Sequence, residues 1–265
     1  MKVKVILLTG SELRHKFFAS FMSSYPNIDL RLVIHESNNK LKKNPLYKKY
    51  KTVKKHVDLR NKVENFFFQS FVKKNKKYKF IQIEKSEIND NKIFQLIKKE
   101  KVNFLISYGC SIISAEFINL FRPNFFNIHL GLSPYYKGAG TNFFPFVNKQ
   151  LQFCGSTIMQ IDKKIDGGKI IHQLRPDFNT EDNIHTIGNK IIKKTAFDLC
   201  KILTTKKRIK FYNLKSEFKT RIYKQKDFNQ KNLMLATSNL KNKLIDKYIK
   251  KKNKMEKKYP IVSQL

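Results

Sequence analysis

The sequence predicts an α/β fold with a mainly parallel, Rossmann-like sheet that is flanked by helices. One observation is a strand–turn–helix opening, in which the apolar stretch Val3 to Leu8 stops at Thr9-Gly10-Ser11 and a helical pattern follows. A second observation is that short apolar stretches alternate with helix-length amphipathic segments as far as residue 107. This alternation is typical of βαβ units joined by right-handed crossovers.

The individual elements of the first half follow from the spacing of apolar residues. Apolar residues recur at helical spacing in three segments, where we expect helices: 12–22, 60–72 and 87–99. Apolar runs predict three further strands: 28–34, 80–83 and 102–107. Residues 38–57 hold eight lysines and neither Asp nor Glu, which indicates a solvated, mobile loop. Arg60 and Glu64, one helical turn apart, are expected to form a surface ion pair without a function.

The amino-acid composition changes in the second half of the chain. Six of the nine glycines fall between residues 131 and 168, where we expect irregular loops that carry function. A helix over 183–203 then closes a first domain, 1–203. Residues 204–265 are expected to form a small α+β appendage. Its predicted elements are strands over 208–212 and 219–223 and a Lys-rich helix over 229–251.

The charge of the chain leaves the class of its partner open. The formal net charge is +35, and 48 of the 55 basic residues are Lys. A charge of this size favours association with nucleic acid. Lys is nevertheless a hydrated point charge that lacks the flat fork with which Arg reads bases and phosphates. The excess is equally explained as compositional background in a protein with a small-molecule substrate.

Cysteine usage and hydropathy favour a cytoplasmic protein. Cys110, Cys154 and Cys200 are widely spaced and form no CxxC pair, so we expect neither a disulfide framework nor a metal site. The apolar run Val5 to Leu8 is too short for a signal peptide, and no stretch of about 18 apolar residues occurs. We therefore expect no membrane association.

Three polar residues have the chemistry required for acyl transfer. Asn127 and His129 are two residues apart on a predicted extended segment, so their side chains project from one face. An amide donor and an imidazole on one face can stabilise an oxyanion. Asp166, in an Asp-Gly-Gly turn, can supply a carboxylate that acts on His129 and handles protons, and Asp162 is a competing carboxylate. By spacing alone, a structural buried histidine remains an alternative.

A resemblance to a known family extends this interpretation. Three segments occur in order: Asn127-x-His129, Leu132-Ser133-Pro134-x-Tyr136-Lys137-Gly138 and Ile165-Asp166-Gly167-Gly168. Together they resemble the formyltetrahydrofolate-dependent formyltransferases, which include glycinamide ribonucleotide, methionyl-tRNA and amino-sugar N-formyltransferases. The similarity covers about residues 1–203 and includes residues 104–113, which resemble the family's folate-pocket segment. The resemblance implies the formyltransferase fold.

The resemblance also implies an activity and a set of site residues. The chain would transfer a formyl group from 10-formyltetrahydrofolate, a co-substrate, to a primary amine, without a metal. Asn127 and His129 would polarise the formyl carbonyl, and Asp166 would assist proton removal from the amine. The implied folate-binding residues are Leu105, Ile106, Ser107, Asp162, Ile165 and Gly167. Candidate acceptor-binding residues are Gly10 and Ser11, at a helix N-terminus, and Lys137 and Thr141.

Three acceptors remain open at this point. We expect the amine of a small metabolite, either an amino-sugar nucleotide or glycinamide ribonucleotide, although Glu12 would repel a phosphate in the second case. Methionyl-tRNA is an alternative that the +35 charge favours, but residues 204–265 are too few for the C-terminal barrel of the tRNA enzymes. A catalytically inactive, basic RNA-binding protein on the same fold is a second alternative. The sequence also leaves a homodimer open.

Overall fold

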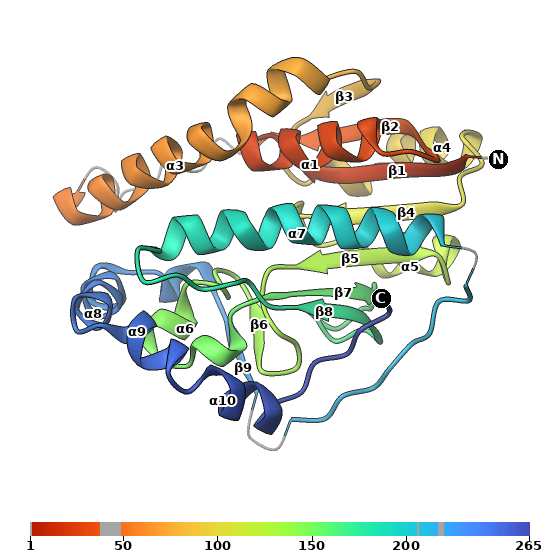
Figure 1. Ribbon diagram of the computed structural model, residues 1–265. Helices are drawn as coiled ribbons and strands as arrows, with labels where there is room; N and C mark the ends of the chain where they lie inside the picture. The colour runs from red at the N-terminus through yellow and green to blue at the C-terminus, as the bar shows by residue number, and fades with distance from the viewer. Residues whose placement is uncertain (1, 38–48, 206, 217–219) are drawn as a thin grey trace.

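The computed structural model describes residues 2–37, 49–205, 207–216 and 220–265, and its centre is a seven-stranded sheet (Figure 1). The strands are β1 (Val3–Gly10), β2 (Ile28–Glu36), β3 (Phe80–Ile83), β4 (Phe104–Tyr108), β5 (Phe125–His129), β7 (Ser156–Gln160) and β8 (Ile170–Leu174). Their order is β3-β2-β1-β4-β5-β7-β8. The strands from β3 to β5 run parallel, and β7 and β8 are antiparallel to their neighbours. The predicted α/β class with a mainly parallel sheet is confirmed.

Helices cover both faces of this sheet. One face is covered by α1 (Leu13–Ser24), α3 (Lys51–Asn75) and α7 (Ile184–Thr204), which share a core in which the rings of Phe17 and Phe68 stack at 4.5 Å. The other face is covered by the 3-10 helix η1 (Glu87–Asn89), α4 (Asn91–Lys99) and α5 (Ala115–Phe121). Each face of the sheet therefore has its own hydrophobic core.

Two helix boundaries in the first half differ from the prediction. The helix α3 begins at Lys51, so residues 51–57 are helical and not part of a loop, while residues 38–48 lie outside the described part of the chain. Val53 and Val57, one turn apart, are buried and hold this first part of α3 on the protein. The helix expected over 87–99 is divided at Asp90, whose backbone is extended.

The order of the parallel strands creates a topological switch point between β1 and β4. The chain moves from β1 outward to β2 and β3, and then returns to β4 on the other side of β1 before it reaches β5. Tyr108, at the end of β4, is in register with Thr9 of β1 and Ile128 of β5. The carboxyl ends of the three strands thus meet at one edge, which is where open α/β sheets bind ligands.

The remaining elements lie beside the end of the sheet that holds β7 and β8 (Figure 1). They are β6 (Tyr136–Gly138), α6 (Phe144–Val147), η2 (Leu151–Phe153), β9 (Arg221–Tyr223), η3 (Gln225–Asp227), α8 (Gln230–Lys241), α9 (Leu244–Ile249) and α10 (Lys252–Lys258). The single helix predicted over 229–251 is wrong, because the chain turns at Lys243, where φ is +56°. The strand predicted over 208–212 is also wrong, since Tyr212 makes only an isolated bridge to Ile170.

Residues after 204 pack closely against the first part of the chain. The strands β6 and β9 pair in parallel, and the Gln173 N–H donates to the Val262 carbonyl at 2.7 Å. Asn239 of α8 is buried, and its Nδ2 donates to the carbonyls of Phe146 and Val147 at 2.9 and 3.0 Å. These carbonyls end α6 and have no partner within that helix. Within the described residues, no helix is long and apolar enough to cross a membrane.

We expect Asn239→Ala to destabilise the protein, because it leaves the two buried carbonyls at the end of α6 without donors. The expected loss is about 1–3 kcal/mol in the free energy of unfolding. Urea unfolding followed by circular dichroism measures it. Asn253→Ala, on the exposed side of α10, is the matched control and should change the free energy of unfolding little. Equal effects of the two variants would contradict the assigned role of Asn239.

Candidate active site

Asn127, His129 and Asp166 meet at the carboxyl end of β5. Asn127 and His129 are two residues apart on β5, so their side chains project from the same face of the sheet. Asp166 lies on the loop that joins β7 to β8. His129 Nδ1 is 3.1 Å from Asp166 Oδ2, and Asn127 Nδ2 donates to Asp166 Oδ1 at 3.3 Å. The structure therefore brings the three predicted catalytic residues into contact.

Both ring nitrogens of His129 face acceptors. His129 is 5% exposed, with Nε2 2.8 Å from the Tyr136 carbonyl and Nδ1 beside Asp166. A carbonyl oxygen can only accept, and an ionised carboxylate can only accept. The His129 ring is therefore held between the Tyr136 carbonyl and the Asp166 carboxyl group.

The orientation of the Asn127 amide is set by the neighbouring strand. Ser107 of β4 is in register with Asn127, and its hydroxyl donates to Asn127 Oδ1 at 2.9 Å. Because the amide oxygen accepts from Ser107, the Nδ2 group is turned toward Asp166. Nδ2 has two hydrogens, and Asp166 uses one of them. The second hydrogen is available to an oxygen atom in the cavity.

Asp166 is positioned by its own backbone and by the segment that contains β6. Its φ is +45°, a left-handed conformation that few side chains adopt. The Gly138 N–H donates to Asp166 Oδ2 at 2.8 Å. Gly138 has a φ of +90°, and a Cβ atom there would lie 2.1 Å from the carbonyl oxygen of Tyr223 in β9. Only glycine fits this position, so the pairing of β6 with β9 helps to place the carboxylate.

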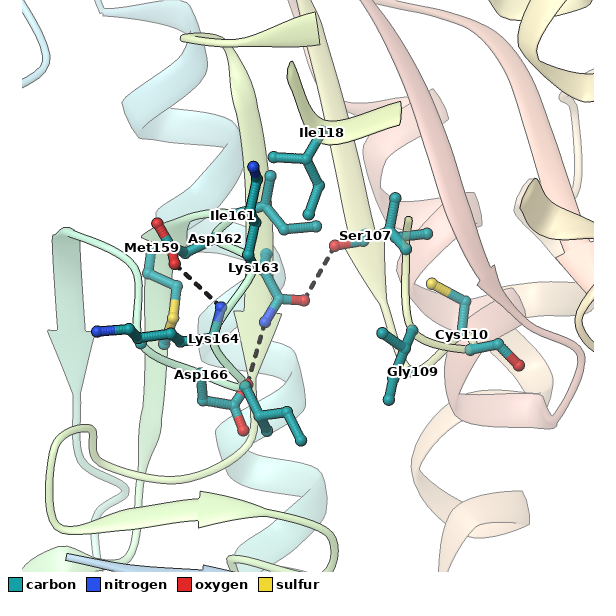
Figure 2. Close-up of a pocket in the computed structure, with 16 residues that line it drawn as sticks. Ser107, Gly109, Cys110, Ile118, Met159, Ile161, Asp162, Lys163, Lys164 and Asp166 are labelled. Carbon is teal, nitrogen blue, oxygen red and sulfur yellow. Dashed lines mark hydrogen bonds between the residues drawn. The ribbon is translucent and has the colours of Figure 1, made fainter. Parts of the chain in front are cut away.

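A first cavity, here called the folate-side cavity, opens beside Asn127 and Asp166 (Figure 2). Four of the predicted folate-binding residues line it: Ser107, Asp162, Ile165 and Gly167. Leu105 and Ile106 do not, because they are buried in the cores on opposite faces of the sheet. The segment 109–113, just beyond β4, lines the cavity instead.

The walls of the folate-side cavity are held by two carboxylates. Glu36, at the end of β2, accepts from the backbone N–H groups of Ser86 and Ser111, each at 2.7 Å. Asp162 accepts from the Lys164 N–H at 3.0 Å and from Arg122 at 2.7 Å. The bond from the Lys164 N–H lowers the pKa of Asp162 most, and Arg122 lowers it further. In this structure Asp162 shapes its loop, whereas Asp166 contacts His129.

A second cavity adjoins the first, and we call it the acceptor-side cavity after the predicted acceptor-binding residues. It shares Gly109, Cys110, Asn127 and Asp166 with the folate-side cavity, and its lining also includes Arg14, His15 and Tyr108. Of the predicted acceptor-binding residues, Thr141 lines it, whereas Gly10, Ser11 and Lys137 are not among its lining residues. The His15 ring covers Gly10, since a Cβ on Gly10 would lie 2.7 Å from it. Lys137 lies on β6, where it pairs with Ile222 of β9.

Arg14 and His15 belong to a cluster of charged residues that the sequence analysis did not predict. Arg14 of α1 contacts Glu64 of α3 at 2.8 Å and Glu12 at 3.3 Å, and Arg60 Nε lies 3.8 Å from Glu64. His15 Nδ1 is 2.7 Å from Glu12. The expectation that Arg60 and Glu64 form a surface pair is wrong, because Glu64 is only 5% exposed. The helical spacing of the two residues was visible in the sequence, but the packing of α1 on α3 was not.

The cluster changes the ionisation of its members. Burial raises the pKa of Glu12, but the hydrogen bond with His15 and the charge of Arg14 outweigh it and lower the pKa to about 2. Burial lowers the pKa of His15 below its ordinary value. Burial also lowers the pKa of Arg14, but Glu64 and Glu12 raise it more. Glu12 is thus ionised and paired, and does not present a bare carboxylate to the cavity.

Comparison with known proteins identifies the family. The family model described as formyl transferase matches residues 30–201, which is more than half of the chain. The chain belongs to the formyltransferase family. The resemblance predicted from the Asn, His and Asp segments is therefore confirmed, and the matched residues include all three.

The individual formyltransferases that match this chain have low sequence identity to it. The methionyl-tRNA formyltransferase of Buchnera aphidicola is 28% identical over 149 residues, which cover 55% of this chain and 41% of that protein. The matches thus span less than half the length of the curated relatives concerned. A phosphoribosylglycinamide formyltransferase from Anaplasma phagocytophilum has a TM-score of 0.51 at 18% identity, covering 76% of this chain and 85% of that one. A sugar N-formyltransferase from a Shewanella species has a TM-score of 0.53 at 15% identity, covering 90% and 87%. These structures support the formyltransferase fold.

We expect the free energy of unfolding of this formyltransferase to depend less on pH in the Glu12→Gln variant than in the wild type. The pKa of Glu12 is about 2 in the folded protein and 4.5 ordinarily. A lowered pKa stabilises the folded state fully above the ordinary value, and this contribution is lost as the pH falls toward 2. The free energy of unfolding should therefore fall less in Glu12→Gln than in the wild type between pH 5 and pH 2. Urea titrations across this range measure it.

The control for this prediction is Glu116→Gln, at an exposed position at the start of α5. Its dependence on pH should follow the wild type. Parallel curves for wild type and Glu12→Gln would contradict the lowered pKa of Glu12.

Proposed function

We propose that the chain is an N-formyltransferase that uses 10-formyltetrahydrofolate as co-substrate and formylates a primary amine of a small metabolite. The acceptor would be an amino-sugar nucleotide or a compound of the glycinamide ribonucleotide type. One observation carries the proposal: Asn127 and Asp166 line both cavities, so a donor in one and an amine in the other meet at these side chains. Two substrates brought to one point in this way react as if at high local concentration.

The proposed reaction begins when the amine nitrogen attacks the formyl carbon. A new C–N bond forms, and the carbonyl oxygen becomes an oxyanion. The free hydrogen of Asn127 Nδ2 would donate to this oxygen, and the His129 ring beside it would help to stabilise the negative charge. Because Ser107 and Asp166 already fix the Asn127 amide, little reorientation is needed when the charge develops.

The second half of the reaction expels tetrahydrofolate. The bond between the formyl carbon and N10 breaks, and its electron pair stays on N10. The carbonyl re-forms from the oxyanion, and the proton that the amine loses to Asp166 is passed on to N10, so the enzyme ends in its starting state. Asp166 would take the amine proton, because its carboxylate lies in the acceptor-side cavity and next to His129. The scheme requires no covalent bond to the enzyme.

Methionyl-tRNA is the second candidate acceptor. The net charge of +35 favours a polyanionic partner, and methionyl-tRNA formyltransferases are among the relatives in sequence. A catalytically inactive RNA-binding protein is less well supported. Such a protein would not need Asn127, His129 and Asp166, yet these three side chains are in contact with one another. Purified protein should be assayed with 10-formyltetrahydrofolate and each acceptor in turn: an amino-sugar nucleotide, glycinamide ribonucleotide and methionyl-tRNA.

We expect Asn127→Ala and His129→Ala each to lower kcat/KM for formyl transfer by about 100-fold or more, since each removes a group that stabilises the oxyanion. Release of tetrahydrofolate measures the rate. Asn253→Ala, on the exposed side of α10, is the control and should transfer at the wild-type rate. If either site variant keeps near-wild-type activity, the proposed mechanism is wrong.

A further inference from the structure

A row of three polar side chains crosses the sheet at the level of His129. His129 of β5 is in register with Thr157 of β7, and Thr157 is in register with Gln173 of β8. Residues that lie opposite each other in an antiparallel pair project from the same face of the sheet. Thr157 and Gln173 therefore stand on the face that carries Asn127 and His129, although neither of them is among the residues that line the two cavities.

Thr157 and Gln173 hold the segment 131–133, which follows β5 in the chain. Thr157 Oγ1 donates to the Gly131 carbonyl at 2.7 Å and accepts from the Ser133 N–H at 3.0 Å. Gln173 Nε2 donates to the Ser133 carbonyl at 2.6 Å and to Thr157 Oγ1 at 3.3 Å. The main chain of the segment is thus held by two side chains that are hydrogen-bonded to each other.

The side-chain amide of Gln173 is oriented by the C-terminal segment. The Val262 N–H donates to Gln173 Oε1 at 3.4 Å, and the Val262 carbonyl accepts from the Gln173 N–H at 2.7 Å. Because Oε1 faces Val262, the two hydrogens of Nε2 are directed at Ser133 and Thr157. Ser133, Thr157 and Gln173 are all buried. A buried network whose donors and acceptors are paired favours a single arrangement of its atoms.

The segment held in this way leads directly to groups that contact His129 and Asp166. The Tyr136 N–H donates to the Leu132 carbonyl at 3.0 Å, and the Tyr136 carbonyl lies 2.8 Å from His129 Nε2. The Ser133 hydroxyl donates to the main-chain carbonyl of Asp166 at 3.4 Å. A displacement of residues 131–133 would therefore move partners of both His129 and Asp166.

We propose that Gln173 is a positioning residue for formyl transfer, which fixes the segment 131–133 and, through this segment, the geometry of His129 and Asp166. The inference rests on the proposed function and deepens it, since it adds a residue that acts on the reaction without contacting a substrate. A small misplacement of reacting groups lowers the rate of the chemical step strongly. Loss of the Gln173 hydrogen bonds should therefore lower kcat and leave folate binding unchanged.

The first test is Gln173→Met, which keeps the length of the side chain and removes its hydrogen bonds. With whichever of the three candidate acceptors the wild type formylates, kcat should fall about 10-fold or more. The Kd for 5-formyltetrahydrofolate should not change. The nitrogen NMR signals of the His129 ring should shift, because the Tyr136 carbonyl moves relative to Nε2.

The matched control is Thr195→Val, which removes a buried hydroxyl from α7. Thr195 Oγ1 lies 2.7 Å from Ser156 Oγ and donates to the Ile191 carbonyl at 2.7 Å. Ser156 precedes Thr157 on β7, so this pair lies on the opposite face of the strand. Thr195→Val should destabilise the protein but leave kcat and the His129 signals as in the wild type.

The second test is Gln173→Glu, which keeps the shape of the side chain and an oxygen that can accept from the Val262 N–H. An ionised carboxylate cannot donate to the Ser133 carbonyl, whereas a protonated carboxyl group can. The ratio of the variant's kcat to that of the wild type should therefore rise as the pH is lowered from about 8 to about 6, since burial makes the introduced carboxyl group easier to protonate. A side chain that only fills space would give a ratio that does not depend on pH.

Each outcome bears on one of the two proposals. A kcat in Gln173→Met equal to that in Thr195→Val, or a kcat ratio in Gln173→Glu that is constant with pH, overturns this inference and leaves the proposed formyl transfer intact. Unchanged His129 signals in Gln173→Met also overturn it. If 5-formyltetrahydrofolate binds to the wild type but no acceptor releases tetrahydrofolate from 10-formyltetrahydrofolate, the proposed function fails and this inference fails with it.

Discussion

The Asp166 carboxylate is the interaction on which the rest of the site depends. One oxygen contacts His129 Nδ1 and the Gly138 N–H, and the other accepts from Asn127 Nδ2. This one carboxylate thus fixes the imidazole, the amide and β6 relative to one another. Removing it would leave the buried imidazole and the half-buried amide without their acceptor, which costs more than the pairs themselves contribute. The carboxylate is therefore the structural centre of the site.

The C-terminal segment takes part in this arrangement although none of its described residues lines either cavity. The strand β9 pairs with β6, and the carbonyl of Tyr223 lies so close to Gly138 that no side chain fits there. The Gly138 N–H donates to Asp166, so residues 221–223 help to position the Asp166 carboxylate through Gly138. Asn239 and Val262 secure further parts of the same segment. The described residues after 204 thus pack against the segment that positions Asp166.

The sequence predicted local patterns well and long-range packing poorly. Asn127, His129 and Asp166 were predicted to act together because of their types and order, and the structure brings them into contact. Leu105 and Ile106 were predicted to bind folate, but alternate residues of β4 point into the two cores and neither residue lines the folate-side cavity. The charged cluster was not predicted because it depends on the packing of α1 against α3, and its partners Arg14 and Glu64 are 50 positions apart in the sequence. Such contacts leave no periodic signal in the chain.

We propose that the formyl group of the co-substrate lies where the two cavities meet. A crystal structure of the protein with a stable 10-formyl analogue of tetrahydrofolate is the decisive test. We expect the formyl oxygen at about 3 Å from Asn127 Nδ2, with the formyl carbon facing the acceptor-side cavity and Asp166 still paired with His129. A formyl group held away from Asn127, or a pterin bound outside the folate-side cavity, would contradict it.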